Sequence, residues 1–175
     1  MSASPASTVD PAPPPALLAR LRALLAQVPD PEIPVLSVLD LGVVRHLMQR
    51  PDGTLEVGVS PTYSGCPATP VIRRDIERAL AAAGFRVATV DVLSPPWTSD
   101  WISADGRRKL AAFGIAPPVQ AVGSARALLH PDPHVPCPRC GSQTTSRLSE
   151  FGSTPCKALY RCEACREPFD YFKCL

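Results

Sequence analysis

The sequence predicts an α/β domain at residues 15–116, followed by a four-cysteine zinc ribbon at residues 137–175. In the first region apolar residues recur at helical and at strand spacing, in the order helix, strand, strand, helix, strand, helix. In the second region this periodicity gives way to two C-x-x-C pairs. Most of the 22 prolines lie outside the periodic segments, which indicates a disordered tail at residues 1–14 and a linker at residues 117–136.

The first half of the predicted domain contains a helix and a hairpin. Residues 15–28 form the expected helix, because six apolar side chains share one face: Leu17, Leu18, Leu21, Leu24, Leu25 and Val28. Three prolines between residues 29 and 34 end this helix and predict an extended loop. Residues 43–48 and 55–59 are the expected strands, and Pro51-Asp52-Gly53 between them is a turn signal.

The second half adds a helix, a strand and a short final helix. Apolar residues from Ile72 to Ala83 recur at helical spacing, and Gly84 is suited to end that helix. Residues 85–93 alternate as a strand does. Asp100 or Ser103 is expected to cap the last helix, which ends at Gly114.

Cys66 lies in the loop at residues 60–70, directly before the second helix. Pro67 and Pro70 both suit a first helical turn, and the sequence leaves open which of them begins the helix. Either start places Cys66 near the positive end of the helix dipole, with Arg73 and Arg74 one turn on. This setting favours the thiolate, which binds metals and attacks electrophiles. The local sequence leaves a second interpretation open, in which Cys66 is a small buried packing residue.

The C-terminal region carries four cysteines with the spacing of a metal site. Two C-x-x-C pairs are separated by 21 residues, and four thiolates close a tetrahedral zinc site. A region of about 40 residues is too small to form a stable core without such a metal site. The expected ligands are Cys137, Cys140, Cys162 and Cys165. Of the two remaining cysteines, Cys174 is expected to pack, whereas Cys156, which precedes Lys157, has no assigned role.

Composition excludes several classes of function. The net charge of +2 is too small to argue for nucleic acid or an anionic membrane. Arg20 and Arg22 interrupt the best candidate for a membrane span, and no secretory signal is expected. Seven cysteines in a C-x-x-C pattern favour metal ligation in the reducing cytoplasm over disulfides. No histidine is placed beside Cys66 as a base, so a cysteine hydrolase is poorly supported.

Three blocks of sequence resemble the metal–sulfur cluster assembly domain family, which includes SufT-type proteins. They are Asp30-Pro31-Glu32-Ile33-Pro34, Asp40-Leu41-Gly42-Val43-Val44 and Thr62-Tyr63-Ser64-Gly65-Cys66-Pro67. The resemblance implies a small mixed-sheet α+β domain whose functional thiol is Cys66, with Asp30, Glu32 and Thr62 nearby. From the residues alone, Asp30 and Glu32 around Pro31 are more typical of a turn than of acid–base catalysis.

The added ribbon, with residues 151–154 and 169–174, is similar to accessory subunits of phenylacetyl-CoA epoxidases. This resemblance implies a non-catalytic helper in phenylacetate degradation. It would assist iron–sulfur or di-iron centre assembly in a partner, either the di-iron oxygenase or the reductase with flavin and a [2Fe–2S] cluster. Structural Zn²⁺ in the ribbon and transient iron or a cluster at Cys66 are the expected cofactors, and a homodimer stays open.

Two alternatives remain from the sequence. The chain could be a structural or electron-transfer subunit of the oxygenase complex, with redox-active iron in the ribbon in place of zinc. It could also be a nucleic-acid-binding ribbon, but from Cys137 onward six Lys and Arg stand against four Asp and Glu, without a basic stripe. The second alternative is therefore the weaker.

Overall fold

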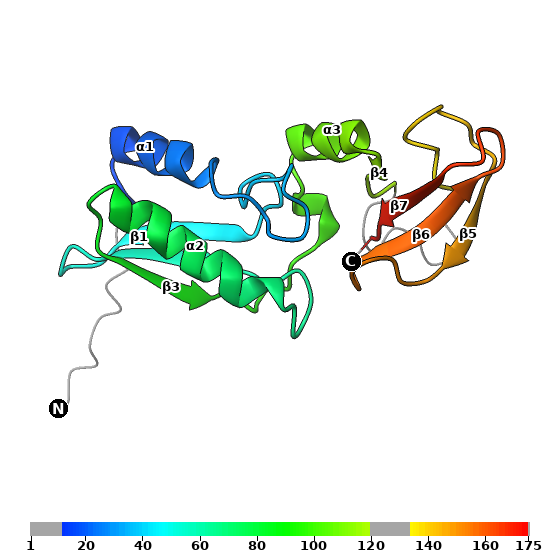
Figure 1. The fold of residues 1–175 in the computed structure, drawn as a ribbon. Helices are drawn as coiled ribbons and strands as arrows, with labels where there is room; N and C mark the ends of the chain where they lie inside the picture. The colour runs from blue at the N-terminus through cyan, green and yellow to red at the C-terminus, as the bar shows by residue number, and fades with distance from the viewer. Residues whose placement is uncertain (1–11, 120–133, 175) are drawn as a thin grey trace.

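The computed structural model describes residues 12–119 and 134–174. Two sheets lie toward opposite ends of an elongated molecule, with helix α3 (Ala104–Phe113) between them (Figure 1). The strands of the first sheet, in the order β1-β2-β3, are β1 (Val44–Gln49), β2 (Leu55–Val59) and β3 (Val87–Asp91). The second sheet, in the order β4-β7-β6-β5, contains β4 (Ile115–Ala116), β5 (Thr145–Ser149), β6 (Lys157–Cys162) and β7 (Pro168–Phe172). The mixed α+β class is confirmed.

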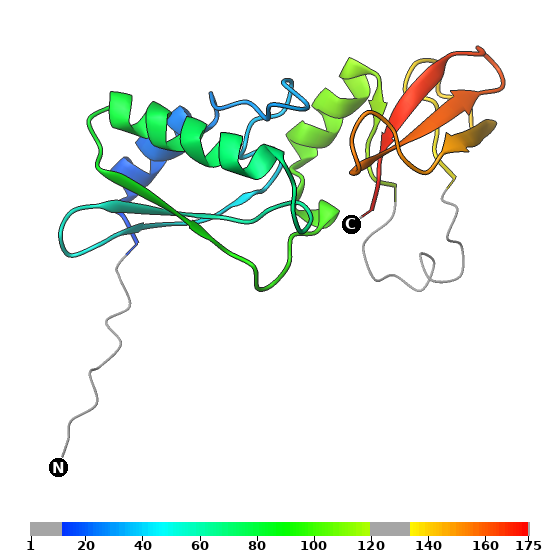
Figure 2. The same ribbon diagram turned by 60° about the horizontal axis from the view of Figure 1, so that its bottom comes forward.

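The first sheet is covered on one face by helices α1 (Pro15–Leu25) and α2 (Ala68–Ala82), as Figures 1 and 2 show. β1 pairs antiparallel with β2, as the predicted hairpin requires, and β2 pairs parallel with β3 through the α2 crossover. The helix faces with apolar periodicity supply fully buried side chains to this core: Leu21, Leu25, Ile76 and Leu80.

The structure settles which residues begin and end the helices. α2 begins at Ala68, so Pro67 stands directly before the first helical residue. Ser103, not Asp100, caps α3, because its side chain accepts the N–H of Gly106. Gly114 ends α3 with a φ of 93°, a conformation that glycine adopts without the strain of a β-carbon.

The segment after α1 differs from the extended loop that its prolines predict. Pro29 and Ser37 form an antiparallel bridge, and the N–H of Asp30 donates to Leu36 O at 2.8 Å. The loop is therefore compact, because its backbone and the Asp30 side chain supply hydrogen bonds that the prolines cannot.

The second sheet begins earlier than the predicted ribbon. Ile115 and Ala116, the last residues of the predicted first domain, pair in parallel with β7. Val135 is fully buried in the core of this sheet, although it falls in the predicted linker. The predicted tail at residues 1–14 and the rest of the predicted linker at residues 117–136 lie largely outside the described residues.

Residues from the C-terminal region also enter the core of the first domain. Cys156 and Phe172 are buried in the cluster that contains α1, α2 and the first sheet. The Phe172 ring packs on Trp97 with 6.1 Å between the ring centroids, and Trp97 Nε1 donates to Leu41 O at 3.0 Å. The chain end turns back toward the middle of the molecule, as Figure 1 shows. The two predicted units therefore share a core.

Among the described helices, none is long and apolar enough to cross a bilayer.

Candidate functional site

Cys66 is held at the start of α2 by a tight turn that follows β2. Its N–H donates to Tyr63 O at 3.2 Å, and its carbonyl accepts the N–H of Thr69 at 3.2 Å. Gly65 has a φ of 80°, which allows the chain to reverse directly before the cysteine. The residue is only 8% exposed, so its thiol is accessible over a small area.

An open groove of about 500 Å³ lies between α2 and β3, and Cys66 forms part of its lining. Arg73 and Arg74 line the same groove, but Arg73 is engaged with β3. It donates to Thr89 Oγ1 at 2.9 Å and to Asp91 at 3.0 Å. The sequence predicts that both arginines support the Cys66 thiolate, whereas the structure pairs Arg73 with β3 and Arg74 with Asp75.

A second, nearly closed cavity lies on the inner side of Cys66. The volume that the centre of a water molecule could occupy within it is about 20 Å³. The four residues that the family resemblance indicated all line it: Asp30, Glu32, Thr62 and Cys66. The sequence blocks that carry the resemblance thus meet in one place. Ser60, Cys156 and Phe172 complete this cavity from other segments.

Asp30 serves the loop as well as the cavity. Its Oδ1 accepts the N–H groups of Glu32 at 2.9 Å and Ile33 at 2.7 Å, so the turn-forming interpretation is correct for this side chain. Burial raises the pKa of Asp30 despite these donors. Burial and the neighbouring Asp30 charge also raise the pKa of Glu32. The cavity therefore opposes negative charge unless a cation accompanies it.

Sequence reasoning missed the part that the C-terminal region plays here. Cys156 is 4% exposed, and burial raises the pKa of its thiol. Its neighbour Lys157 is also 4% exposed, pairs with Asp170 at 3.3 Å, and contributes positive charge near Asp30 and Glu32. In the sequence Cys156 is marked by its small polar neighbours and by Lys157, and the fold brings it to the Cys66 cavity.

Two hydroxyl groups beside Cys66 are buried without a hydrogen-bond partner among the described residues. They belong to Ser60 and Tyr63. Burial, with Cys66 nearby, raises the pKa of Tyr63 to about 12, so this phenol stays protonated at neutral pH. Because buried hydroxyls are nearly always satisfied, the Ser60 hydroxyl indicates a ligand or water in this region, whereas the Tyr63 hydroxyl has the Cys66 thiol beside it.

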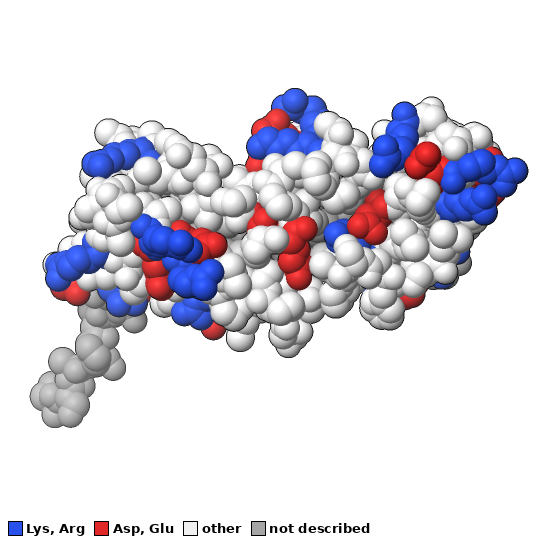
Figure 3. All heavy atoms as spheres, in the orientation of Figure 1, with Lys and Arg blue, Asp and Glu red and all other residues white. Residues whose placement is uncertain are grey.

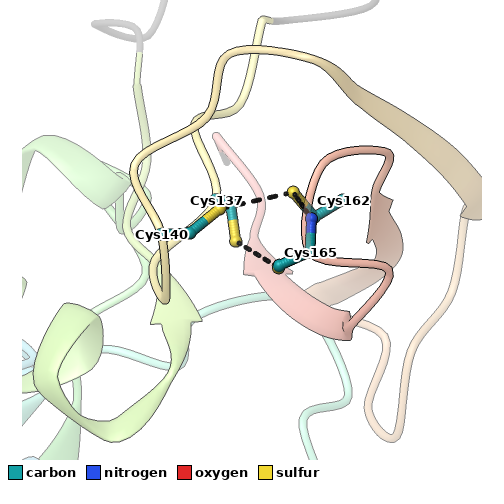
Figure 4. A group of neighbouring side chains, drawn as sticks. All are labelled: Cys137, Cys140, Cys162 and Cys165. Atoms are coloured by element: carbon teal, nitrogen blue, oxygen red, sulfur yellow. Dashed lines mark hydrogen bonds between the residues drawn. The ribbon is translucent and has the colours of Figure 1, made fainter.

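The four remaining predicted site residues form a separate cluster in the C-terminal region, with only Cys162 in a strand and the others in turns (Figure 4). The Sγ atoms of Cys137 and Cys165 are 3.8 Å apart, and those of Cys140 and Cys162 are 3.6 Å apart. Metal–sulfur bonds of about 2.3 Å in a tetrahedron require sulfur atoms about 3.8 Å apart. The cluster thus fits a four-coordinate metal ion, and it leaves no position for substrate.

Two similar turns supply these thiols. In each, the residue after the second cysteine donates its N–H to the carbonyl of the first: Gly141 to Cys137 at 2.9 Å and Arg166 to Cys162 at 3.0 Å. The Cys165 N–H points at Cys162 Sγ, 3.5 Å away. This donor, with the Ala164 N–H and the thiols of Cys165 and Cys140, lowers the pKa of Cys162, while hydrogen bonds with the surrounding thiols raise the pKa of Cys165 despite the N–H of Glu167.

Two family models match this chain. The family model described as an iron–sulfur cluster assembly protein matches residues 18–92, and the PaaD zinc beta ribbon domain matches residues 121–173. A solved structure from Bacillus anthracis, described as Domain of Unknown Function DUF59, matches with a TM-score of 0.50 at 24% identity. It covers 54% of this chain and 92% of that one, and it shows the fold of the first domain.

Two curated relatives extend the comparison. A protein of Escherichia coli K12, named as a putative subunit of 1,2-phenylacetyl-CoA epoxidase, is 54% identical over 154 residues, which cover 87% of this chain and 90% of that protein. The "Fe-S protein maturation auxiliary factor YitW" of Bacillus subtilis 168 is 33% identical over 102 residues, which cover 57% of this chain and 96% of that protein. The chain therefore belongs to the PaaD family of phenylacetyl-CoA epoxidase subunits, with an iron–sulfur cluster assembly domain before its zinc ribbon.

Proposed function

We propose that this chain is a non-catalytic maturation subunit of a phenylacetyl-CoA epoxidase. It assists assembly of the iron–sulfur or di-iron centre of a partner subunit in phenylacetate degradation. The names of the relatives support both halves of this proposal, because one is a subunit of that epoxidase and the other is an iron–sulfur maturation factor. The client is the di-iron oxygenase or the reductase with flavin and a [2Fe–2S] cluster.

The observation that carries the proposal is the position of Cys66 between two spaces. On one side the residue lines the open groove along α2, and on the other it lines the small cavity with Asp30 and Glu32. A thiolate is a strong ligand for iron, and carboxylates are suitable co-ligands. A thiol in this place can hold iron from the protected side while a partner protein approaches along the groove.

The described residues argue against hydrolytic or transfer catalysis by Cys66. A cysteine nucleophile needs an adjacent base, and histidine is the usual one. Of the two described histidines, His46 pairs with Glu56 at 3.1 Å on the β1–β2 hairpin, and His134 is exposed near the ribbon. Neither lines the groove or the cavity at Cys66.

The surface supports a protein partner over nucleic acid. Lys and Arg side chains gather in small groups over α2, over α3 and at the far end of the ribbon, with Asp or Glu beside them (Figure 3). A nucleic-acid interface requires a continuous basic surface. On the face shown, the described residues form no such stripe.

The four-cysteine cluster fits zinc in this proposal and stabilises the C-terminal region. The same four thiols would also fit redox-active iron, which is the basis of the electron-transfer alternative. An absorption spectrum of the purified chain separates the two, because iron bound by thiolates absorbs visible light and zinc does not. We expect a colourless protein that contains zinc.

The experiment that tests the proposed function is co-expression of the chain with each epoxidase subunit in turn. With Cys66→Ser, we expect the client subunit to accumulate with a depleted iron centre, while the variant keeps its own zinc. Cys174→Ser is the matched control, because Cys174 lies outside both groups of site cysteines. A client that is fully metallated beside a stable Cys66→Ser variant would overturn the proposal.

We place this function in the cytoplasm, where a reducing environment keeps the seven cysteines as thiols. Pairing with a second copy of the chain stays a prediction, which light scattering on the purified protein would test.

A further inference from the structure

We propose that the free edge of β1 binds an extended, acidic segment of the client subunit, which adds a strand to the first sheet. This inference rests on the proposed function, because it takes the partner to be the client, and it goes further by naming where the client is held. β1 and β3 are the two edge strands of this sheet. The open groove at Cys66 lies on the β3 side, so a client held at β1 leaves that groove accessible.

The backbone of β1 has hydrogen-bonding groups that face away from the sheet. Leu55 N–H donates to Arg86 O at 2.8 Å, which shows that Leu55 faces β3. Its cross-strand partner Gln49 therefore turns its own N–H and C=O away from β2, and Leu47 does the same two residues earlier. The described residues make no hydrogen bond to these outward groups.

The opposite edge of the sheet is closed by side chains of α2. Thr89 lies in the middle of β3, and its N–H donates to Glu77 Oε1 at 3.3 Å. Its carbonyl accepts a hydrogen bond from Arg73 at 2.9 Å. Side chains that cover an edge in this way prevent a further strand from pairing with it. Of the two edges, β1 is thus the one that can accept a strand.

A groove of about 320 Å³, the β1 groove, lies beside this edge, between β1 and α1. It is lined by Leu18, Arg22, Leu39 and residues 44–47. Apart from its two arginines and one histidine, the lining is aliphatic. Successive side chains of a strand point to opposite faces, so every second side chain of an added strand would enter this groove. Backbone pairing with such a groove alongside is the arrangement used in recognition by strand addition.

The charge of the β1 groove selects an acidic segment. Two arginines line it and no acidic residue does. The Arg45 guanidinium lies over the Trp101 ring, 3.3 Å from the centroid, and donates to Gly42 O at 3.3 Å, so its position is fixed. The Arg22 side chain makes no hydrogen bond or ion pair with the described residues and is available to a carboxylate.

A second copy of this chain does not suit the β1 edge. The strand reads Val-Arg-His-Leu-Met-Gln and contains no acidic residue. Two such edges paired about a twofold axis would bring positive side chains of both copies to the same sheet edge, which is unfavourable for like charges on neighbouring strands. The charge of the groove therefore favours a different protein as the source of the strand.

Amide hydrogen exchange tests this site in the full-length, zinc-loaded chain, alone and mixed with each purified epoxidase subunit. Amides without a hydrogen bond exchange rapidly, and pairing with a strand protects them. We expect one subunit to slow exchange at Leu47 and Gln49 by at least about tenfold. The amides of β5, an edge strand of the second sheet, are the internal control and should not change.

Substitution of Gln49 separates the backbone from the side chain. Gln49→Pro removes the outward N–H, which an edge strand tolerates because that group makes no bond within the sheet. We expect Gln49→Pro to bind the same subunit about fivefold more weakly, the value of one hydrogen bond, and Gln49→Ala to bind as the wild type does. Equal binding of both variants would contradict strand addition.

The arginines test the acidic character of the segment. Arg22→Ala and Arg45→Ala should each weaken binding by up to about fivefold, and the loss should shrink as salt is added. Arg108→Ala is the matched control, because its side chain is 78% exposed on α3, outside the β1 groove. Wild-type affinity in both groove variants would show that the segment is not held by its charge.

The outcomes separate this inference from the proposed function. If a subunit binds and leaves Leu47 and Gln49 unprotected, the docking site is wrong and the maturation role stands. Protection already present in the dilute, isolated chain would assign the edge to residues 1–11, and protection that grows with concentration would assign it to a second copy. Either result, or the absence of binding by every subunit, overturns the inference. Metallation of the client beside Cys66→Ser still decides the proposed function on its own.

Discussion

The two groups of cysteines in this chain are built in different ways. The four-cysteine cluster takes its ligands from two similar turns, and each turn supplies both of its sulfurs from a C-x-x-C pair. The Cys66 cavity instead takes its groups from segments far apart in the sequence, including the Asp30 loop, the end of β2 and the turn before β6.

This difference has a chemical consequence. Four thiols that surround one point fill every coordination position, so a metal there is held and cannot exchange easily. The cavity at Cys66 has a mixed set of thiols and carboxylates and adjoins an open groove. In the function proposed above, the first arrangement holds a structural ion and the second holds iron that is passed on to the client.

The largest expected effect comes from breaking the four-cysteine cluster. Cys162→Ser should lose the bound metal and unfold the C-terminal sheet, because metal binding supplies about 10–16 kcal/mol in small zinc domains. Metal analysis and near-UV circular dichroism would measure both changes. A Cys162→Ser protein that keeps one metal ion and its unfolding midpoint would show that the cluster is not structural, whereas Cys174→Ser should change neither.

The next effect comes from separating the two regions at Phe172. This side chain is 1% exposed, packs on Trp97 and lines the Cys66 cavity. Phe172→Ala should lower the free energy of unfolding by about 3–5 kcal/mol, because it leaves a cavity in the shared core. Urea denaturation would measure this loss.

The matched control is Phe113→Ala, since Phe113 is 57% exposed on α3 and its truncation should change stability by less than about 0.5 kcal/mol. Phe172→Ala should also disturb the Cys66 site while zinc stays in the ribbon. Equal stability of the two variants would show that the regions do not depend on one another.

Much of the fold could be predicted from the sequence because its signals are local. The periodicity of α2 and the turn at Gly53 depend on neighbouring residues, and the four zinc-type ligands depend only on two short spacings. Cys66, Asp30 and Glu32 were recognised through the sequence blocks that contain them, not through any visible pairing.

The contribution of the C-terminal region to the Cys66 cavity could not be predicted. Ile115 and Ala116 join the second sheet, and Phe172 enters the core of the first domain, through contacts between residues far apart in the sequence. No periodic pattern records such contacts. Residues 117–136 were also predicted to be a linker, but Val135 in this range belongs to the second core.

Asp40 connects α3 to the loop that carries Asp30 and Glu32, and its replacement should have a third and smaller effect. Asp40 Oδ2 accepts hydrogen bonds from Lys109 Nζ at 2.7 Å and from Ser37 Oγ at 2.8 Å. Burial alone would raise the pKa of Asp40, but these bonds lower it below 3.8. Asp40→Asn should therefore cost about 1–3 kcal/mol at neutral pH, through loss of charge-assisted hydrogen bonds.

The lowered pKa of Asp40 determines how the stability difference between wild type and Asp40→Asn should change with pH. A carboxyl with a lowered pKa stabilises the folded state above its unfolded pKa, and the contribution is lost as pH falls through the folded value. The stability difference between wild type and Asp40→Asn should thus be full above about pH 5 and shrink below 3.8. Urea midpoints from pH 7 to pH 3 would measure it, and a constant difference would contradict the ionic role of Asp40.

The smallest effect lies within the cluster, at the residue that directly follows each pair of cysteines. Gly141 follows the first pair with a φ of 74°, and Arg166 follows the second with a φ of 66°. A residue with a β-carbon is strained there by about 1–2 kcal/mol, whereas glycine is not. Arg166 gains little stability from its surface pair with Glu163 at 3.5 Å.

Arg166→Gly should therefore stabilise the ribbon by up to about 1 kcal/mol. This figure is the backbone strain that the change relieves, reduced by the greater entropy of glycine in the unfolded chain. The reverse change, Gly141→Ala, should destabilise it by a similar amount. Thermal unfolding of the zinc-loaded proteins would measure both, and a loss of stability in Arg166→Gly would show that the two turns are not equivalent.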